Sequence, residues 1–161
     1  MKIFNEIAEF GKRLASQDNM DNTLSLIGKA AKRFSDAERC SIFIVDNDAH
    51  MLWTKLNDGI GRIVIELDSG IVGDTYMKKE GQIVNEPYKD PRFLQNIDKK
   101  SGFVTKNMLT IPIFNSKREV MGIMQLLNKP HVDFDEKDLE ILTFLANYVS
   151  GNLELVLMQE N

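Results

Sequence analysis

A polar segment of the chain lies between two apolar stretches that both have the pattern of buried β-strands. The first stretch, residues 39–46, contains an unbroken apolar and β-branched run, and the second covers residues 121–129. The segment between them, residues 69–102, is rich in helix starts, hydroxyls and loop residues. Helix N-termini carry free amides that can hold anions, and strands supply a firm wall beside them. The sequence therefore predicts a pocket for a small anionic ligand, with this segment as one wall.

The composition limits the class of protein and its partners. A chain of 161 residues fits a single domain with one core. Its net charge of -4, without a block of basic residues, argues against nucleic acid or an anionic membrane as the main partner. Cys40 is the single cysteine, so no intramolecular disulfide can form, and no uninterrupted apolar run approaches the length of about 18 residues that spans a membrane. We expect a cytoplasmic protein that binds a small molecule or another protein.

The spacing of apolar residues changes between helical and extended periods along the chain. Helical spacing and helix-start signals predict helices over the ranges 3–14, 21–34, 70–79, 90–100 and 135–158. Apolar runs bounded by turn residues predict strands over the ranges 40–45, 51–56, 62–67, 82–85, 107–114 and 119–127. Asp90 before Pro91 is interpreted as a helix start, and Asp135 as the cap of the last helix. Pro112 predicts an edge or a bulge in its strand.

This order of elements indicates an α+β fold, an antiparallel sheet with helices packed on its faces. We divide the chain into an N-terminal helix, residues 1–19, and one domain, residues 20–161, that includes the long C-terminal helix. Beside its main apolar stripe the C-terminal helix carries a second apolar row, made of Ile141, Phe144, Tyr148 and Leu155. The N-terminal stripe has no evident partner either. We therefore expect the terminal helices to bundle together, across the twofold axis of a homodimer.

Several short motifs, taken in order, resemble those of the GAF domain, closest to the type found in cyclic-nucleotide phosphodiesterases and adenylyl cyclases. The matching pieces are residues 39–46, 70–73, 90–93, 98–109 and 125–129. The resemblance covers about residues 21–154. It implies a six-stranded antiparallel sheet with helices on both faces, and a closed pocket that holds cAMP or cGMP in the members that bind them.

The resemblance also implies a set of ligand-binding residues. Those that match pocket positions of the relatives are Ser41, Asp58, Val72, Asp98, Ser101, Thr105 and Gln125. Hydroxyls and carboxylates of this set would bond to the base and sugar, and the free amides near Val72 and Leu94 would hold the phosphate. Asn57 stands where the relatives often place an aromatic ring against the purine, and Gln125 replaces a carboxylate seen in some of them. The choice between cAMP and cGMP stays open.

A further motif of this subgroup, abbreviated NKFDE, is matched at Asn128, Lys129, Phe134 and Asp138. Leu139 occupies the position of its final Glu. In the relatives the Lys and Asp of this motif pair, so the resemblance predicts an ion pair between Lys129 and Asp138.

Two functions from different classes remain open. The first is a sensory domain that binds a cyclic nucleotide and relays binding through the terminal helices of a dimer to a signalling partner such as a cyclase, phosphodiesterase or kinase. The second is a ligand-free dimerisation or interaction module, in which Asp98, Ser101 and Thr105 only satisfy loop backbone. We expect no enzymatic activity and no metal or other cofactor, since Cys40 begins a buried strand and the two histidines, His50 and His131, are flanked by turn residues.

Overall fold

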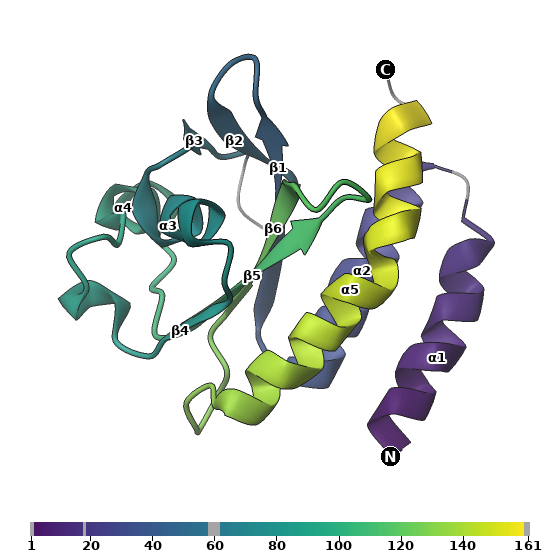
Figure 1. Ribbon diagram of the computed structural model, residues 1–161. Helices are drawn as coiled ribbons and strands as arrows, with labels where there is room; N and C mark the ends of the chain where they lie inside the picture. The colour runs from purple at the N-terminus through teal and green to yellow at the C-terminus, as the bar shows by residue number, and fades with distance from the viewer. Residues whose placement is uncertain (1, 18, 58–61, 160–161) are drawn as a thin grey trace.

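The computed structural model describes residues 2–17, 19–57 and 62–159, and it contains one antiparallel sheet between two layers of helices (Figure 1). The strands are β1 (Arg39–Asp46), β2 (Met51–Asn57), β3 (Val64–Glu66), β4 (Gln82–Val84), β5 (Met108–Phe114) and β6 (Val120–Leu127). Their order across the sheet is β3-β2-β1-β6-β5-β4. The predicted α+β class and the six-stranded antiparallel sheet are therefore confirmed.

Helices cover both faces of this sheet (Figure 1). The helices are α1 (Lys2–Ala15), α2 (Met20–Ser35), α3 (Gly70–Lys78), the 3-10 helix η1 (Pro87–Lys89), α4 (Gln95–Ser101) and α5 (Glu136–Gln159). The first two and the last pack together on one face, and α3 and α4 lie on the other. The terminal helices thus bundle within a single chain, and the homodimer stays a prediction.

The central position of β1 in the sheet explains its unbroken apolar sequence, because neighbouring side chains point to opposite faces and helices cover both faces. Cys40, Ile42 and Ile44 belong to the core under the terminal helices. Ser41 and Phe43 face the other layer, where Phe43 packs with Val72 of α3. The side-chain alternation along β1 therefore assigns each residue either to the main core or to the side of α3.

The second apolar row of α5 is partly covered by α1 of the same chain. The ring of Phe144 meets Phe4 edge to face, with 4.8 Å between ring centroids. Tyr148 lies so close to Gly11 that a Cβ on this glycine would be 2.2 Å from the tyrosine ring. A larger residue at position 11 would require the Tyr148 ring to shift. Leu155, further along α5, is 60% exposed.

Among the described helices, α5 is long and apolar enough to cross a membrane, judged by length and composition alone. A helix in a protein core passes the same test. Leu142, Leu145 and Val149 of α5 are fully buried in the core cluster beneath the terminal helices. Core packing therefore accounts for the buried apolar face of α5.

Two predicted elements differ in the structure. No helix begins at Asp90 in this described stretch: its carboxylate accepts from the backbone N–H of Arg92 at 2.9 Å, as a cap would, but it also binds the Arg92 guanidinium at 2.7 Å and 2.9 Å. The helix starts later, as α4. The strand expected over residues 62–67 is reduced to β3, since the N–H of Ile63 bonds to the hydroxyl of Thr54, 2.9 Å away, in place of a ladder carbonyl.

Pro112 has no backbone N–H, and it lies where the neighbouring strand β4 does not require one. The short β4 pairs with β5 from Met108 to Thr110, so Pro112 is beyond the end of that pairing. The register with β6 shifts directly afterwards, between Ile113 and Phe114. The prediction of an edge or bulge is confirmed.

The Asn128–Asp138 region joins the end of β6 to the start of α5. Asn128 has a positive φ of 64°, and its side chain accepts from the N–H of Lys106 at 2.7 Å and donates to the carbonyl of Val104 at 2.9 Å. Lys129 forms the predicted ion pair with Asp138, at 2.7 Å and 3.0 Å. Asp138 also shares a reciprocal capping pair with Asp135, so Asp135 caps α5 as predicted.

Replacing Asp138 by Ala should lower the free energy of unfolding by about 3 kcal/mol, because it leaves the Lys129 ammonium buried without its partner. The two side chains are only 13% and 9% exposed. Urea unfolding measures the loss. Asp133→Ala, in an exposed loop position nearby, is the matched control and should change stability by less than about 0.5 kcal/mol. Equal losses in the two variants would contradict the importance of the buried pair.

Candidate functional site

A cavity of about 50 Å³ lies between the sheet and the layer of α3 and α4. The predicted ligand residues that line it are Ser41, Val72, Leu94, Asp98, Thr105 and Gln125. The rest of its lining is mostly apolar: Phe43, Ile63, Ile65, Gly70, Ile71, Phe93, Ile97, Met108 and Leu127. The structure thus brings residues from distant parts of the chain together around one cavity.

Two polar residues form part of the sheet side of this cavity. Ser41 of β1 and Gln125 of β6 are directly paired across the two strands. Ser41 is almost fully buried, whereas Gln125 is half-buried. Within the described chain, the Gln125 amide makes no hydrogen bond, and it can both donate and accept. The cavity therefore contains a polar group that a ligand could satisfy.

Asp98 is the polar centre of the opposite wall. Its carboxylate is buried and accepts from the N–H of Thr105 at 2.7 Å, from the Thr105 hydroxyl at 2.9 Å, and from the phenol of Tyr88 at 2.5 Å. The hydrogen bond to Asp98, together with burial, raises the pKa of Tyr88 to about 12. The phenol therefore stays protonated at neutral pH, and its O–H donates a hydrogen bond to Asp98.

The first turn of α3 forms another part of the wall. Its N-cap residue, Ser69, makes no side-chain capping bond, and Ile71 and Val72 of that turn line the cavity. Gly70 has a positive φ of 71°, and a Cβ on Gly73 would lie 2.6 Å from the backbone of Asp68. The backbone therefore requires glycine at both positions, which explains the two glycines of the motif at residues 70–73. The uncapped amides of the turn are potential donors to an anion.

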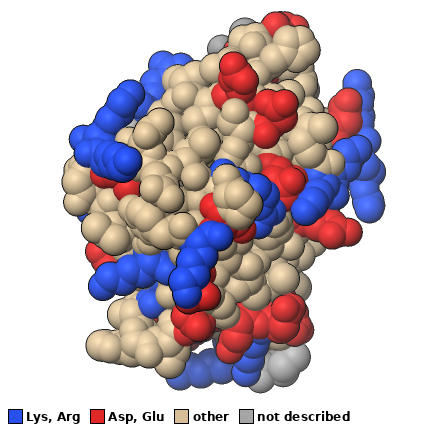
Figure 2. Space-filling view, turned by 90° about the vertical axis from the view of Figure 1, so that its left-hand side faces the viewer, with Lys and Arg blue, Asp and Glu red and all other residues tan. Residues whose placement is uncertain are grey.

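The remaining predicted residues lie elsewhere. Ser101 is outside the cavity, in a neighbouring surface hollow with Arg62 and Lys100, and its hydroxyl accepts from the N–H of Phe103 at 3.2 Å. Asn57 ends β2, but its side chain and the whole of Asp58 lie outside the described residues. On this side of the molecule, basic and acidic side chains are interspersed (Figure 2).

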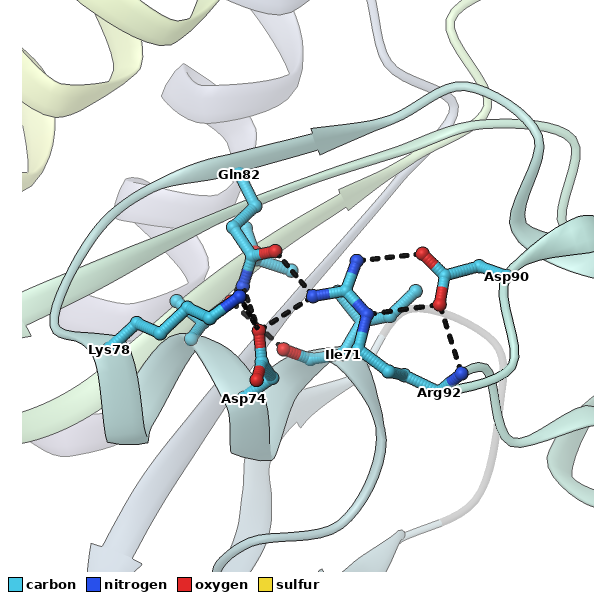
Figure 3. Close-up of polar contacts among 8 residues, drawn as sticks. Ile71, Asp74, Lys78, Gln82, Asp90 and Arg92 are labelled. Atoms are coloured by element: carbon cyan, nitrogen blue, oxygen red, sulfur yellow. Dashed lines mark hydrogen bonds and ion pairs between the residues drawn. The ribbon is translucent and has the colours of Figure 1, made fainter.

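Arg92 joins the segment before α4 to the rest of the wall (Figure 3). Besides its bonds to Asp90, its guanidinium donates to Asp74 of α3 and to Gln82 of β4, each at 2.6 Å. Hydrogen bonds from Arg92 lower the pKa of Asp90. Burial opposes ionisation of Asp74, but hydrogen bonds from Lys78, Gln82 and Arg92 still lower its pKa.

These contacts were not anticipated from the sequence. Tyr88, Asp74 and Gln82 were not among the predicted site residues, and Arg92 was noted only within a motif. The motif at residues 90–93 is the one sequence signal that could have led to them, since an Asp and an Arg two residues apart can pair locally.

The sole cysteine and both histidines lie away from the cavity. Cys40 is completely buried on the side of β1 that faces the terminal helices, and His50 and His131 are exposed with positive φ angles. Among the described residues, no group of three His, Cys, Asp or Glu side chains could hold a metal ion.

The fold and the position of the cavity define the class of this chain as a GAF-type α+β domain. The sequence profile of the GAF domain matches residues 19–153, and the chain therefore belongs to the GAF domain family.

The relatives include cyclic-nucleotide enzymes. The chain is 33% identical over 140 residues to the dual 3',5'-cyclic-AMP and -GMP phosphodiesterase 11A of Takifugu rubripes, covering 74% of this chain and 15% of that protein. It is 32% identical over 123 residues to the cGMP-specific 3',5'-cyclic phosphodiesterase of Drosophila pseudoobscura pseudoobscura, covering 65% of this chain and 11% of that protein. The chain thus corresponds to a small part of these enzymes.

Solved structures share the fold at lower identity. The GAF domain from an Acinetobacter phosphoenolpyruvate-protein phosphotransferase has a TM-score of 0.84 at 19% identity, covering 100% of this chain and 98% of that one. The free methionine-R-sulfoxide reductase from Neisseria meningitidis has a TM-score of 0.81 at 16% identity, covering 95% and 89%. At these identities the likeness shows the fold alone.

Replacing Arg92 by Met should lower the free energy of unfolding by about 2 kcal/mol at pH 7, because several charge-assisted hydrogen bonds are lost together. The pKa values of Asp74 and Asp90 are lowered from 3.8 in the folded state, so this stabilisation is present above about pH 4 and disappears as pH falls further. The difference between the two proteins in urea unfolding should therefore shrink below pH 4.

Lys89→Met is the matched control for this experiment, because it removes a cation whose pair with Glu86 is exposed, at 77% and 69%. We expect a change within about 0.5 kcal/mol and no such pH dependence. A difference for Arg92→Met that stays constant from pH 7 to pH 3 would contradict the role assigned to the two carboxylates.

Proposed function

We propose that this chain is a small-molecule sensory domain of a signalling protein and that it binds a cyclic nucleotide, cAMP or cGMP, in the cavity. The observation that carries the proposal is the unbonded Gln125 amide facing an otherwise largely apolar cavity, opposite Asp98 and Thr105. Membership of the GAF family and the likeness to phosphodiesterases that act on cyclic nucleotides support the choice of ligand.

The groups around the cavity suit the parts of a cyclic nucleotide. The uncapped first turn of α3, at Ile71 and Val72, would hold the phosphate. Asp98, Ser41 and Gln125 would bond to the sugar and base, while the apolar lining would contact the purine. The proposed ligand-binding set keeps Asn57, Asp58, Leu94, Ser101 and Thr105 as further members, with Ser101 beside the cavity.

Binding would require the wall of α3 and α4 to move outward. Ligand pockets usually measure roughly 300–1,000 Å³, and the present cavity is about 50 Å³. The sheet offers a route from such a movement to the terminal helices. Ser41 and Gln125 face the cavity, and their neighbours Ile42 and Met124 on the same strands are fully buried under the terminal helices. A shift of β1 or β6 would therefore reach α2 and α5 directly.

The second candidate function is a ligand-free dimerisation or interaction module. Two observations favour it: the small volume of the cavity, and the three hydrogen bonds that Asp98 already accepts from its own chain. In either case the domain would regulate a signalling partner rather than catalyse a reaction. We place it in the cytoplasm, where the buried Cys40 would stay reduced.

Calorimetric titration with cAMP and then cGMP tests the proposal. One of the two should bind, and Gln125→Ala should weaken its binding about tenfold, because a hydrogen bond inside the cavity is lost. Gln17→Ala, in the link between α1 and α2, is the matched control and should bind as the unaltered protein does. If neither nucleotide binds and a denatured extract contains no ligand, the ligand-free module is supported instead.

We also propose that the domain is a homodimer that joins through its terminal helices. Leu155 and Met158, near the end of α5, are 60% and 63% exposed. Light scattering should give twice the mass of 18.4 kDa, and Leu155→Asp with Met158→Asp should shift the protein toward the monomer, since charges would enter an apolar contact. Leu145 and Val149 cannot serve this test, because they are fully buried in the core. A monomer at high protein concentration would contradict the dimer.

A further inference from the structure

Part of the cavity wall is a short segment, residues 93–97, that we call the flap. Phe93, Leu94 and Ile97 of the flap line the cavity. Directly before the flap, Arg92 is bound to Asp74 and Gln82 (Figure 3). Directly after it, Asp98 is bound to Thr105. The flap is thus held at both ends by polar contacts.

Apolar packing holds the flap less firmly than it holds α3: Phe93 is half-buried against the cluster around Ile71, and Leu94 and Ile97 are also only half-buried. In α4, which begins within the flap, Asp98 is the single buried residue of the helix. Gln95 and Asn96 of the flap are exposed. By contrast, Ile71 and Val72 of the neighbouring α3 are 2% and 4% exposed. Segments with few buried apolar contacts open at low free-energy cost. The flap is therefore the part of the wall that depends more on the polar contacts at its ends than α3 does.

Tyr88 contacts the first residue of the flap, Phe93, and the residue directly after the flap, Asp98. Its ring lies 5.1 Å from the ring of Phe93, centroid to centroid. Its phenol donates to Asp98, 2.5 Å away. Tyr88 belongs to η1, which follows β4 and begins at the buried Pro87. The tyrosine therefore bridges the flap while its own backbone is anchored elsewhere.

Of the three hydrogen bonds that Asp98 accepts, the one from Tyr88 can be replaced by a ligand. A carboxylate offers about four lone-pair positions, and three are filled by Thr105 and Tyr88. The loop that contains Thr105 is fixed by Asn128, which binds the residues on either side of it. Tyr88 is 44% exposed, so its phenol can turn to solvent and bond to water.

We infer that Tyr88 holds the flap closed over the cavity and competes with the ligand for Asp98. A ligand that enters the cavity takes the place of the phenol with a donor of its own, a sugar hydroxyl or an N–H of the base. The nature of this ligand rests on the proposed function. The closure by Tyr88 does not, and it can be tested on the protein alone.

Hydrogen exchange of the ligand-free full chain, followed by mass spectrometry, tests the closure. Tyr88→Phe keeps the ring contact with Phe93 and removes only the donor, so amides of residues 93–101 should exchange about fivefold faster. Amides of β1 and β6 should be unaffected. Tyr148→Phe, on α5 in the opposite helix layer, is the matched control and should leave the flap unchanged. Unchanged exchange in Tyr88→Phe, or an equal rise throughout the sheet, would overturn the inference.

Titration of the same variants with cAMP and cGMP tests the competition. Tyr88→Phe should bind the preferred nucleotide about threefold more tightly, because one bond no longer has to break before entry. The 2'-deoxy analogue of the preferred nucleotide shows which donor binds Asp98. A large loss of affinity assigns the sugar hydroxyl to Asp98, and little loss assigns the N–H of the base. Weaker binding by Tyr88→Phe would overturn the competition. Faster flap exchange without binding of either nucleotide would support the closure by Tyr88 and contradict the cyclic-nucleotide proposal.

Discussion

The two faces of the central strands β1 and β6 are covered by different kinds of interaction, and this difference shapes the molecule. On one face, α1, α2 and α5 form a continuous apolar core with residues such as Ile42 and Met124. On the other face, apolar packing is divided between two smaller clusters, around Phe43 and Ile71. The polar side chains of Ser41, Asp98, Thr105 and Gln125 lie at the cavity on this face. The layer on that second face consists of the short helices α3 and α4, and the cavity lies between them and the sheet.

On the face that contains the cavity, carboxylates hold the surrounding segments in place. Asp98 holds the end of the flap and Asp74, through Arg92, holds its beginning, so the wall of the cavity depends on hydrogen bonds that a polar ligand can exchange. An apolar wall of the same size would lack this property, because its contacts are not directional.

The sequence predicted what depends on periodicity and local caps. The unbroken run of β1, the stripes of α1 and α5 and the Asp135 cap all follow from neighbouring residues, and the cavity residues Ser41, Asp98 and Gln125 followed from a family resemblance. It failed at Asp90 before Pro91, which matches a helix cap: the carboxylate accepts from the backbone N–H of Arg92 and also binds the Arg92 guanidinium, and the helix begins only at Gln95. Contacts between distant residues, such as Asp98 with Tyr88, have no periodic signal to reveal them.

The central claim is that polar bonds rather than packing close the cavity. Native-state hydrogen exchange of the unaltered protein without ligand tests it most directly, because each region reports its own opening free energy. The account predicts that amides of the flap and α4 exchange at least about a hundredfold faster than those of β1, β6 and α5. Protection of the flap equal to that of the central strands would contradict the account, since it would place the flap in the same cooperative unit as the core.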